Sequence, residues 1–468
     1  MTGAEKTKDQ GPRQAILIIH GIGEQQPNET LRRFVDGLIG KDQCVDGLIG
    51  KDQCFVKPDR ISDTLELYRL SAPRTPSQQI RTDFYELYWA HQMGDTTWGH
   101  VTAWLRVLLL RRRSEVPARL RTAWTLAWLM LIVAAIGTAI YWPGATTAAA
   151  YGVFGAAVVW IVRAAAGSFG LHYAGDAARY LSATAPNVKV RHAIRRSALE
   201  VLRGLHSNPY HSTQHYDRIV VVGHSLGSVI AYDALKYLWQ EWHSYPGDVC
   251  DKTDLEQPVW RKMRDRINTR RAETDKDYRS LQRELWDEQR RLGIKWKITD
   301  FVTLGSPLAH AEFLLARDRR DLCSRKMDRE LPTCPPQPED FRDAGLLCKT
   351  ARFEGHDHDV LVLHHAGLFA CTRWTNLYFT NDIIGGPLKP QLGSQIKDVE
   401  LRDPPKGLFG GSWPTSHLHY WHRAPESALA SLREALDLTY SGHSLRETCP
   451  DRENVVEAAR RSPVTGEE

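Results

Sequence analysis

A serine in the pentapeptide GHSLG, at residues 223–227, is of the type and setting that nucleophilic catalysis requires. The GxSxG pattern arises by chance in about one chain in seven of this length, so its flanks decide its meaning. The apolar run RIVVV precedes it and SVIAYDALKYL follows it, which predicts a strand, a sharp turn and an amphipathic helix. In such a turn the serine backbone is strained, and the flanking glycines let the neighbouring segments approach. Ser225 is therefore the predicted nucleophile.

A serine hydroxyl also needs a base to take its proton and an acidic group to orient that base. Behind a serine on a strand-to-helix turn, these partners follow in the order acid, then histidine. Asp382 ends the segment WTNLYFTND, and His417 follows the last predicted strand in SWPTSHLHYWHR, so we expect Asp382 to orient His417. The alternatives also lie near predicted strand ends: Asp359 or Asp403 as the acid, and His419, the main rival, or His422 as the base.

Backbone N–H groups are expected to bind the oxyanion that forms during acyl transfer. One donor should be the residue directly after the nucleophile, Leu226. The other should come from the loop after the first strand, where the two glycines of HGIG at residues 20–23 permit close approach of the backbone. We expect Ile22 to supply this N–H, with Gly21 as the alternative.

The segments that must position these residues alternate between strand and helix patterns. Apolar β-branched or aromatic runs predict strands within residues 14–20, 218–222, 297–307, 373–382 and 396–401. Helical spacing follows Asn28, a candidate N-cap, follows Ser225, and recurs at about 172–207 and 424–438. This order predicts an α/β fold, with a mostly parallel sheet and helices on both faces.

The 468 residues are expected to form one enlarged domain with insertions. Its first part covers residues 14–94, where the decapeptide VDGLIGKDQC at 35–44 recurs unchanged at 45–54 and should lengthen a helix end or a surface loop. Its remainder covers residues 171–440. The expected insertions are a membrane segment at 95–170, a charged and solvated helix pair within 246–296, and a loop-rich segment at 320–345; a polar tail follows at 441–468.

No charged residue occurs between Thr122 and Val162, a stretch of 41 residues that is long enough for two membrane spans. Pro143 and Gly144 break it, which predicts a helical hairpin with spans at about 122–142 and 145–162. Arginines flank both open ends, so the positive-inside rule places the flanks in the cytoplasm and the turn on the far side. TTWGHVTAWLRVLLLRRR, just upstream, is typical of an interfacial helix. The alternative is a buried hydrophobic hairpin inside a soluble core.

The motifs resemble the α/β-hydrolase fold and, within it, bacterial lipase-like serine hydrolases related in pattern to glycolipid-anchor deacylases. The motifs that carry this resemblance are HGIGEQQP at 20–27, GHSLGS at 223–228, TLGSPLAHA at 303–311, WTNLYFTNDIIGGPL at 374–388 and HLHYW at 417–421. The resemblance implies that the GSP segment ends a strand near the site and that the aspartate precedes a glycine-rich turn. It also implies that the catalytic histidine begins an HxxYW run, which favours His417 over His419. About half of the chain is covered, in separated islands, so the substrate is not implied.

Charge and composition exclude several functions. A net charge of +5, from 61 basic and 56 acidic residues, is too balanced for a nucleic-acid-binding surface. The segment 354–365 gathers His356, His358, His364, His365, Asp357 and Asp359. No second motif with metal-ligand spacing accompanies it, so we expect a surface loop, no metal and no cofactor.

The sequence predicts a membrane-anchored serine hydrolase that cleaves carboxylic esters through an acyl-enzyme, with lipid esters as the substrates. It should lie in the inner membrane, with its catalytic domain facing the cytoplasm, since the N-terminus lacks a secretory signal. The alternatives are a thioesterase or soluble-ester hydrolase, and a non-catalytic membrane scaffold or sensor that retains the fold. Head group, acyl-chain length and oligomeric state are not indicated by the residues.

Overall fold

The computed structural model describes most of the predicted catalytic domain. The described residues are 12–22, 26–39, 54–59, 61–62, 66–73, 80–93, 109–116, 180–181, 185–207, 216–243, 257–269, 275–337, 348–352, 359–382, 384–402, 415–421 and 426–438, with single positions between 121 and 136. Two alternative site residues, Asp403 and His422, lie outside these ranges, as do the polar tail and nearly all of the second decapeptide copy.

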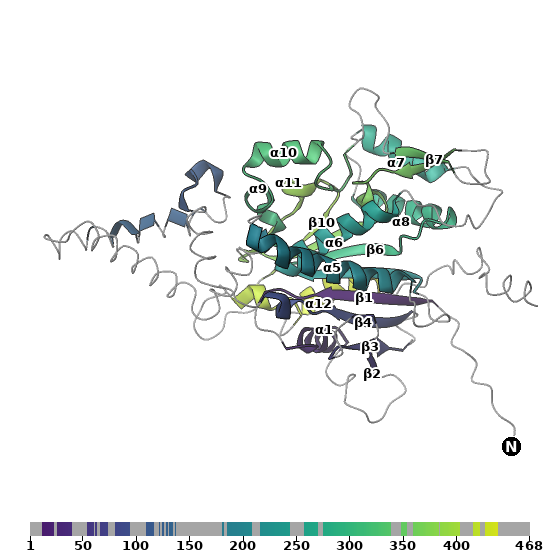
Figure 1. Ribbon diagram of the computed structural model, residues 1–468, viewed down its shortest axis with the longest axis horizontal. Helices are drawn as coiled ribbons and strands as arrows, with labels where there is room; N and C mark the ends of the chain where they lie inside the picture. Colours follow the sequence, from purple (N-terminus) through teal and green to yellow (C-terminus); the bar gives the residue numbers. More distant parts are fainter. Residues whose placement is uncertain are drawn as a thin grey trace, which may run out of the picture.

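An eight-stranded, mostly parallel sheet forms the centre of the molecule, in the order β10-β9-β6-β5-β1-β4-β3-β2. Its strands are β1 (Arg13–Ile19), β2 (Phe55–Pro58), β3 (Tyr68–Ala72), β4 (Arg81–Leu87), β5 (Arg218–His224), β6 (Ile298–Leu304), β9 (Arg373–Phe379) and β10 (Lys397–Leu401). The strands from β10 to β4 run parallel, while β3 and β2 are antiparallel additions at one edge. The prediction of an α/β fold with a mostly parallel sheet is confirmed (Figure 1). The carboxyl ends of the six parallel strands lie at one edge of this sheet.

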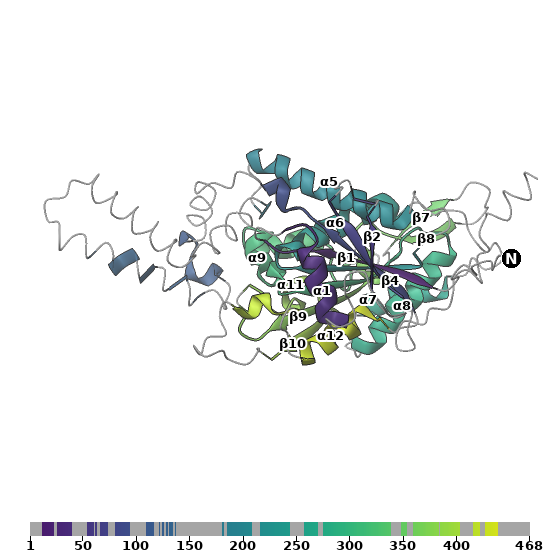
Figure 2. The ribbon, with the colours of Figure 1, turned by 90° about the horizontal axis from the view of Figure 1, so that it is seen from below.

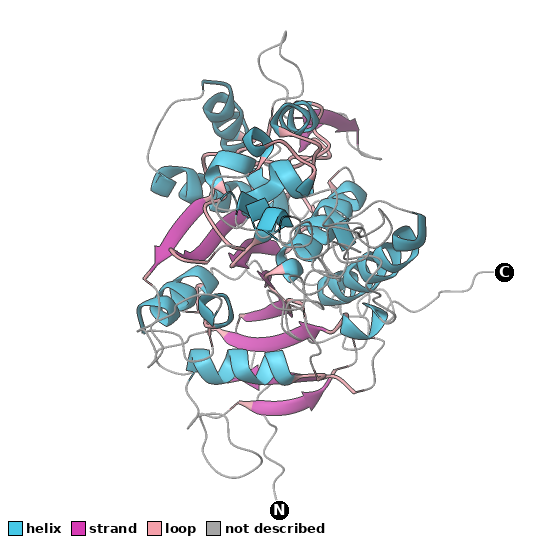
Figure 3. Cartoon of the chain, turned by 90° about the vertical axis from the view of Figure 1, so that its left-hand side faces the viewer, coloured by secondary structure: helices cyan, strands magenta, loops and turns pink. Residues whose placement is uncertain are grey.

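Helices cover both faces of the sheet, as Figures 1 and 3 show. On β1, Ala15, Leu17 and Ile19 face one buried cluster, and Ile16 and Ile18 face the other. This alternation follows from the two-residue period of a strand. The helices on the first side are α5 (Ala185–Ser207), α6 (Leu226–Trp242), α7 (Pro258–Thr269) and α8 (Asp275–Arg291). Those on the second are α1 (Glu29–Ile39) and α12 (Glu426–Leu436), which lie in front of the sheet in Figure 2.

Helix α1 begins where Asn28 predicted, but the Asn28 side chain does not cap it. Asn28 has φ 66, and its amide group donates to the Glu66 carbonyl and accepts from the Tyr68 N–H at 2.9 and 3.0 Å. Glu86, on β4, instead accepts from the Leu31 N–H at 3.3 Å. Asn28 is therefore the N-cap by position, since its carbonyl accepts from the Arg32 N–H at 3.0 Å. The side-chain acceptor for the first turn comes instead from the buried Glu86.

The insertions differ in part from the prediction. Helices α7 and α8 fall within the charged segment, yet their inner faces are buried: Trp260, Met263, Tyr278, Leu285 and Trp286 belong to the core. The pair is thus part of the core layer and is not solvated all round. The segment expected to be loop-rich begins with helix α10 (Arg319–Met327), which follows the short helix α9 (Ala311–Leu314). A separate two-stranded sheet joins β7 (Cys348–Arg352) to β8 (Asp359–Leu363), and the short helix α11 (Lys389–Leu392) precedes β10.

The uncharged stretch at 122–162 lies largely outside the described residues. Where positions are described, Leu129, Ile132, Val133 and Ile136 are each at least half exposed. No helix among the described residues combines the length and apolar character needed to cross a bilayer. The inserted hairpin of the expected architecture therefore has no support from this part of the chain.

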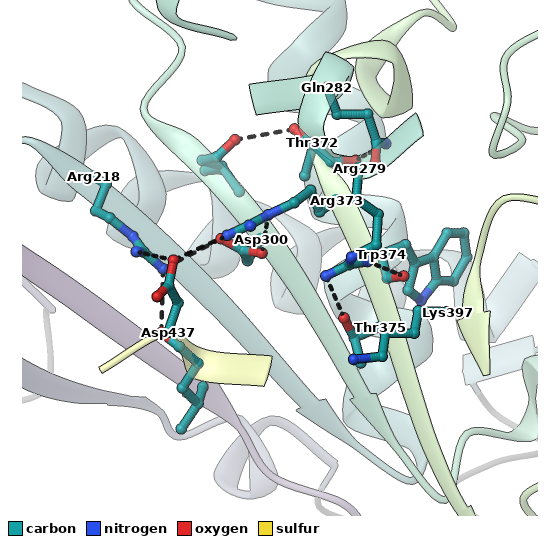
Figure 4. A network of polar contacts seen from close by, with 12 residues as sticks. Arg218, Arg279, Gln282, Asp300, Thr372, Arg373, Trp374, Thr375, Lys397 and Asp437 are labelled. Carbon is teal, nitrogen blue, oxygen red and sulfur yellow. Dashed lines mark hydrogen bonds and ion pairs between the residues drawn. The ribbon is translucent and has the colours of Figure 1, made fainter. Parts of the chain in front are cut away.

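A buried ion network fixes the sheet at the end where β5 and β9 begin (Figure 4). Asp300 of β6 contacts Arg218 at 3.2 Å and Arg373 at 2.8 Å, and both arginines also reach Asp437, just after α12. Although burial disfavours the charged form of Asp300, Arg373 and Arg218 hold its pKa well below the ordinary value. The network ties three strands to α12 at the edge opposite the carboxyl ends.

Candidate active site

Ser225 occupies the sharp turn between β5 and α6. Its backbone has φ 50 and ψ −130, a conformation that is costly for a residue with a side chain, and the residue is 2% exposed. The Ser225 N–H donates to the Leu304 carbonyl at the end of β6, at 3.0 Å. The turn therefore holds the serine at the carboxyl edge of the sheet.

The glycines of GHSLG are required by close packing around this turn. A Cβ on Gly227 would lie 2.2 Å from the Ile19 carbonyl oxygen, and one on Gly223 would lie 2.4 Å from the Ser228 Cα. Such contacts are far inside van der Waals distance. Only glycine lets α6 pack this closely against the end of β1.

Asp382 and His417 form a buried pair although 35 positions separate them. Asp382 lies beyond the end of β9, and His417 lies in the short 3-10 helix η7 (Thr415–Leu418). The His417 Nδ1 is 2.8 Å from the Asp382 Oδ2, and the two residues are 5% and 2% exposed. Because a carboxylate can only accept, Nδ1 carries the proton and Nε2 is left as an acceptor.

The Asp382 carboxylate is held by several donors. Tyr420 O–H donates to Oδ2 at 2.8 Å, and the Ile384 N–H donates to Oδ1 at 2.9 Å. Burial by itself would raise the pKa of Asp382, but His417 and hydrogen bonds from His417, Gly385 and Tyr420 hold the pKa well below its ordinary value. Asp382 is therefore an ionised acceptor that fixes the orientation of the imidazole.

Gly305 links the serine turn to this pair. It follows Leu304, whose carbonyl accepts from the Ser225 N–H, and it has φ +55. A Cβ at Gly305 would lie 2.9 Å from the Asp382 Oδ2 and 3.0 Å from the His417 Cε1. The imidazole edge thus lies against the strand end that holds the serine. The His417 Nε2 is buried and has no hydrogen-bond partner among the described residues.

His224, directly before the serine, contacts His417 through a hydrogen bond and through its ring. Its Nε2 donates to the His417 carbonyl at 3.0 Å, and the two ring centroids are 5.1 Å apart. Burial, followed by the neighbouring His417, lowers the pKa of His224 to about 3. His224 therefore stays neutral, and its side chain donates to the backbone carbonyl of His417.

The loop after β1 lies against the serine from the other side. A Cβ on Gly21 would come within 2.9 Å of the Ser225 Cβ. His20 Nδ1 donates to the Gly21 carbonyl at 2.7 Å, its Nε2 accepts from the Trp89 N–H at 3.3 Å, and its ring stacks on the Trp89 indole. Burial lowers the pKa of His20 to about 4, so this contact is made by a neutral ring.

Both expected oxyanion donors are at this edge. Leu226 is the first residue of α6, where an N–H has no acceptor within the helix, and it is 1% exposed. Ile22 follows Gly21 in the loop and is 4% exposed. The N-terminus of α6, which carries the positive end of the helix dipole, lies at Ser225. It would stabilise the negative charge that develops on an oxyanion beside the serine.

The structure distinguishes among the alternative residues. His419 is partly exposed and follows η7, while the imidazole that contacts Asp382 is that of His417. Asp359 begins β8 in the separate two-stranded sheet, where it pairs in register with Arg352. Sequence reasoning assigned no role to Tyr420, His224 or Gly305, although these residues lie within the HLHYW, GHSLG and TLGSP motifs.

Metal-binding geometry is absent from the part of the chain that the structure describes. No group of three or more His, Cys, Asp or Glu side chains there could hold a metal ion. His364, from the candidate metal segment, bonds to the Gln337 carbonyl through Nε2 and accepts from the Ala366 N–H through Nδ1. Residues 354–358 of that segment lie outside the described residues.

Comparisons with known proteins identify no relative of this chain. No protein family matches the sequence, no characterised protein resembles it closely enough to count as a match, and no solved structure matches the fold.

Proposed function

We propose that this protein is a serine hydrolase of the α/β-hydrolase type that cleaves carboxylic esters through an acyl-enzyme. The observation that carries the proposal is the buried Asp382–His417 contact of 2.8 Å, with an unbonded Nε2, beside a serine held in a strained strand-to-helix turn. An imidazole that a carboxylate orients through Nδ1, with Nε2 left as an acceptor, is suited to take the proton of a serine hydroxyl.

In the proposed reaction, the Ser225 Oγ attacks the ester carbonyl carbon while the His417 Nε2 takes the hydroxyl proton. Asp382 stabilises the imidazolium, and the Leu226 and Ile22 N–H groups stabilise the oxyanion. The bond between the carbonyl carbon and the alcohol oxygen then breaks, and His417 returns the proton to the departing alcohol. Water, activated by His417, attacks the acyl-enzyme in the same manner and releases the carboxylic acid.

Lipid esters are the proposed substrate class, with a lipase or phospholipase activity. This part of the proposal rests on the uncharged stretch at 122–162, with proposed spans at 122–142 and 145–162, and on exposed apolar side chains at its described positions. Arg111, upstream of the stretch, lies 4.3 Å above the Phe313 ring, just after the loop that follows β6. In Figures 1 and 2 the described pieces of 109–136 lie to the left of α9, the helix that contains Phe313.

We propose the inner membrane as the location, with the catalytic domain on the cytoplasmic side. The arginines that flank the stretch favour this orientation. A reporter fused in the turn at Pro143 should be active only beyond the membrane; a cytoplasmic signal there would refute the hairpin. Flotation with liposomes of the deletion variant that lacks residues 122–162 provides the control for membrane binding.

Labelling with a fluorophosphonate tests the catalytic proposal directly. Such a probe phosphonylates only an activated serine, so we expect modification of the wild-type protein and none of Ser225→Ala. Ser431→Ala, which removes an exposed helical serine hydroxyl, should label like the wild type. A folded wild-type protein that is not labelled would refute the hydrolase proposal and favour the alternative, a non-catalytic membrane scaffold or sensor. A lipid panel assayed with the unlabelled wild-type enzyme, with Ser225→Ala as the inactive control, then identifies the ester that is cleaved.

A further inference from the structure

The carbonyl group of Ser225 receives two hydrogen bonds from Ser228. The Ser228 N–H donates to it at 3.0 Å, as the turn into α6 requires, and the Ser228 Oγ donates to it at 2.6 Å. Ser228 is fully buried. The side-chain bond is therefore additional to what the turn itself needs.

A second serine fixes the direction of the Ser228 hydroxyl. The Ser228 Oγ is 2.7 Å from the Oγ of Ser306, which follows Gly305 in the loop after β6 and is also fully buried. Since the single hydroxyl hydrogen of Ser228 is donated to the Ser225 carbonyl, Ser306 is the donor in its contact with Ser228. Ser306 in turn accepts from the Leu308 N–H at 3.2 Å. The bonds form one directed chain from Leu308 to the nucleophile's own carbonyl.

A trans peptide unit is planar, with its C=O and N–H pointing in opposite directions. The carbonyl held by Ser228 belongs to the same unit as the Leu226 N–H. Fixing that oxygen therefore fixes the direction of the N–H on the opposite side, towards the space in front of Ser225.

We propose that the Ser228–Ser306 hydroxyl pair positions the Leu226 N–H as an oxyanion donor. The inference rests on the proposed hydrolase function and assigns both serines as positioning residues, since neither touches the substrate. A helical serine often bonds a carbonyl one turn back. Here that carbonyl belongs to the strained nucleophile, and a buried partner from another strand end aligns the hydroxyl. Preorganised donors of this kind contribute to catalysis because they need not reorient as charge develops.

The test compares Ser228→Ala, Ser306→Ala and the double variant with a matched control, Thr372→Val. Thr372 is also fully buried, and its hydroxyl donates to the Ile298 carbonyl at 3.0 Å, at the start of β6 and thus far along the strand from Ser306. All variants are assayed for fluorophosphonate labelling, for kcat and KM on a p-nitrophenyl ester, and for inhibition by a trifluoromethyl ketone. The hemiketal oxyanion of that inhibitor occupies the oxyanion site.

We expect Ser228→Ala to lower kcat by about 10-fold or more, with KM changed by less than about 2-fold, and to weaken the ketone by a similar factor. Ser306→Ala should act in the same direction to a smaller extent. The double variant should resemble Ser228→Ala, because both residues act through one carbonyl. Thr372→Val should lose stability without a change in kcat or in inhibition.

Unchanged kcat and ketone affinity in a folded Ser228→Ala protein overturn the positioning role. If Ser228→Ala does not fold, the same two unchanged values in Ser306→Ala overturn it. A wild-type protein that is neither labelled nor active overturns the proposed hydrolase function, and the positioning role with it. If the wild-type protein is modified by the probe and, without the probe, hydrolyses the ester, the proposed hydrolase function stands. The variants alone then decide whether Ser228 and Ser306 have the positioning role.

Discussion

Two donors, His417 Nδ1 and the Tyr420 hydroxyl, converge on one carboxylate oxygen of Asp382, each at 2.8 Å. Asparagine at this position would present either an amide oxygen or an N–H₂ group to the same donors. With the N–H₂ group facing His417, the imidazole would adopt the wrong tautomer and lose its ability to accept the serine proton.

We therefore expect Asp382→Asn to lower kcat for ester hydrolysis by about 10³-fold or more, with little change in KM. Asp398→Asn is the control, because Asp398 also accepts several hydrogen bonds, from Asn376, Leu388 and Lys389, but on β10. Equal losses of kcat in the two variants would contradict the assignment of Asp382.

Gly305 has no functional group, yet the site depends on its missing side chain. A Cβ there would lie 2.7 to 3.0 Å from the Tyr420 ring, the Asp382 carboxylate and the His417 ring, at a backbone φ of +55 that disfavours alanine. Gly305→Ala should displace the pair and reduce kcat by about 100-fold or more, since small misplacements of catalytic groups are costly. Gly367→Ala, whose Cβ meets its neighbours at 3.0 Å or more, is the control. A folded Gly305→Ala enzyme with normal turnover would contradict this.

Ser225, Asp382 and His417 could be selected from the sequence because each follows a segment with a clear strand pattern. Their supporting residues could not. Tyr420 reaches back to both Asp382 and the Phe379 N–H, and Ser306 reaches Ser228 across 78 positions. Such partners are chosen by packing between strand ends, which no local pattern encodes.

At the scale of elements, strands β1 and β5 were predictable because they are nearly continuous apolar runs, as buried parallel strands are. Strands β6 and β9 were predictable because they are rich in aromatic and β-branched residues. Strand β4 was not, although it lies next to β1 in the sheet centre. Its buried Asp83 and Glu86 interrupt the pattern. Asp83 can be buried there because Arg13, Arg69 and the Tyr216 hydroxyl contact it.

Glu86 makes the junction of β4 and α1 sensitive to pH. Burial raises the pKa of Glu86 to about 7, although the Leu31 and Asn28 N–H groups and Thr30 bond to it. Between its ordinary pKa of 4.5 and about 7, the folded protein binds a proton that the unfolded chain lacks, so stability falls as pH rises through this window.

Glu86→Gln removes this titration. The free energy of unfolding of the variant minus that of the wild type should therefore rise by roughly 2.5 kcal/mol from pH 5 to pH 8, since one pKa unit corresponds to about 1.4 kcal/mol. Denaturant unfolding at the two pH values measures the difference. A stability difference that stays constant with pH would contradict the raised pKa.

At the scale of the whole molecule, two groups of buried polar residues lie at opposite edges of the sheet. Ser225, Asp382 and His417 lie at the carboxyl edge, where the loops after β5, β9 and β10 meet. Arg218, the first residue of β5, and Asp300, near the start of β6, lie at the opposite edge in the network of Figure 4. Stability and catalysis should therefore respond to different substitutions.

Asp300→Asn tests this separation. The substitution leaves Arg218, which is fully buried, and Arg373 without their shared carboxylate, and removing one partner of a buried ion pair costs about 3 to 5 kcal/mol. The melting temperature should fall clearly. The kcat is measured well below the melting temperature and divided by the number of active sites, which fluorophosphonate labelling of a parallel sample counts; it should stay within about 2-fold of wild type. Glu434→Gln is the control: it breaks the more exposed Lys397–Glu434 pair between β10 and α12 and should cost less than about 1 kcal/mol. A fall in kcat per labelled serine in Asp300→Asn would show that the network also shapes the carboxyl edge, and that the two ends of the sheet are coupled.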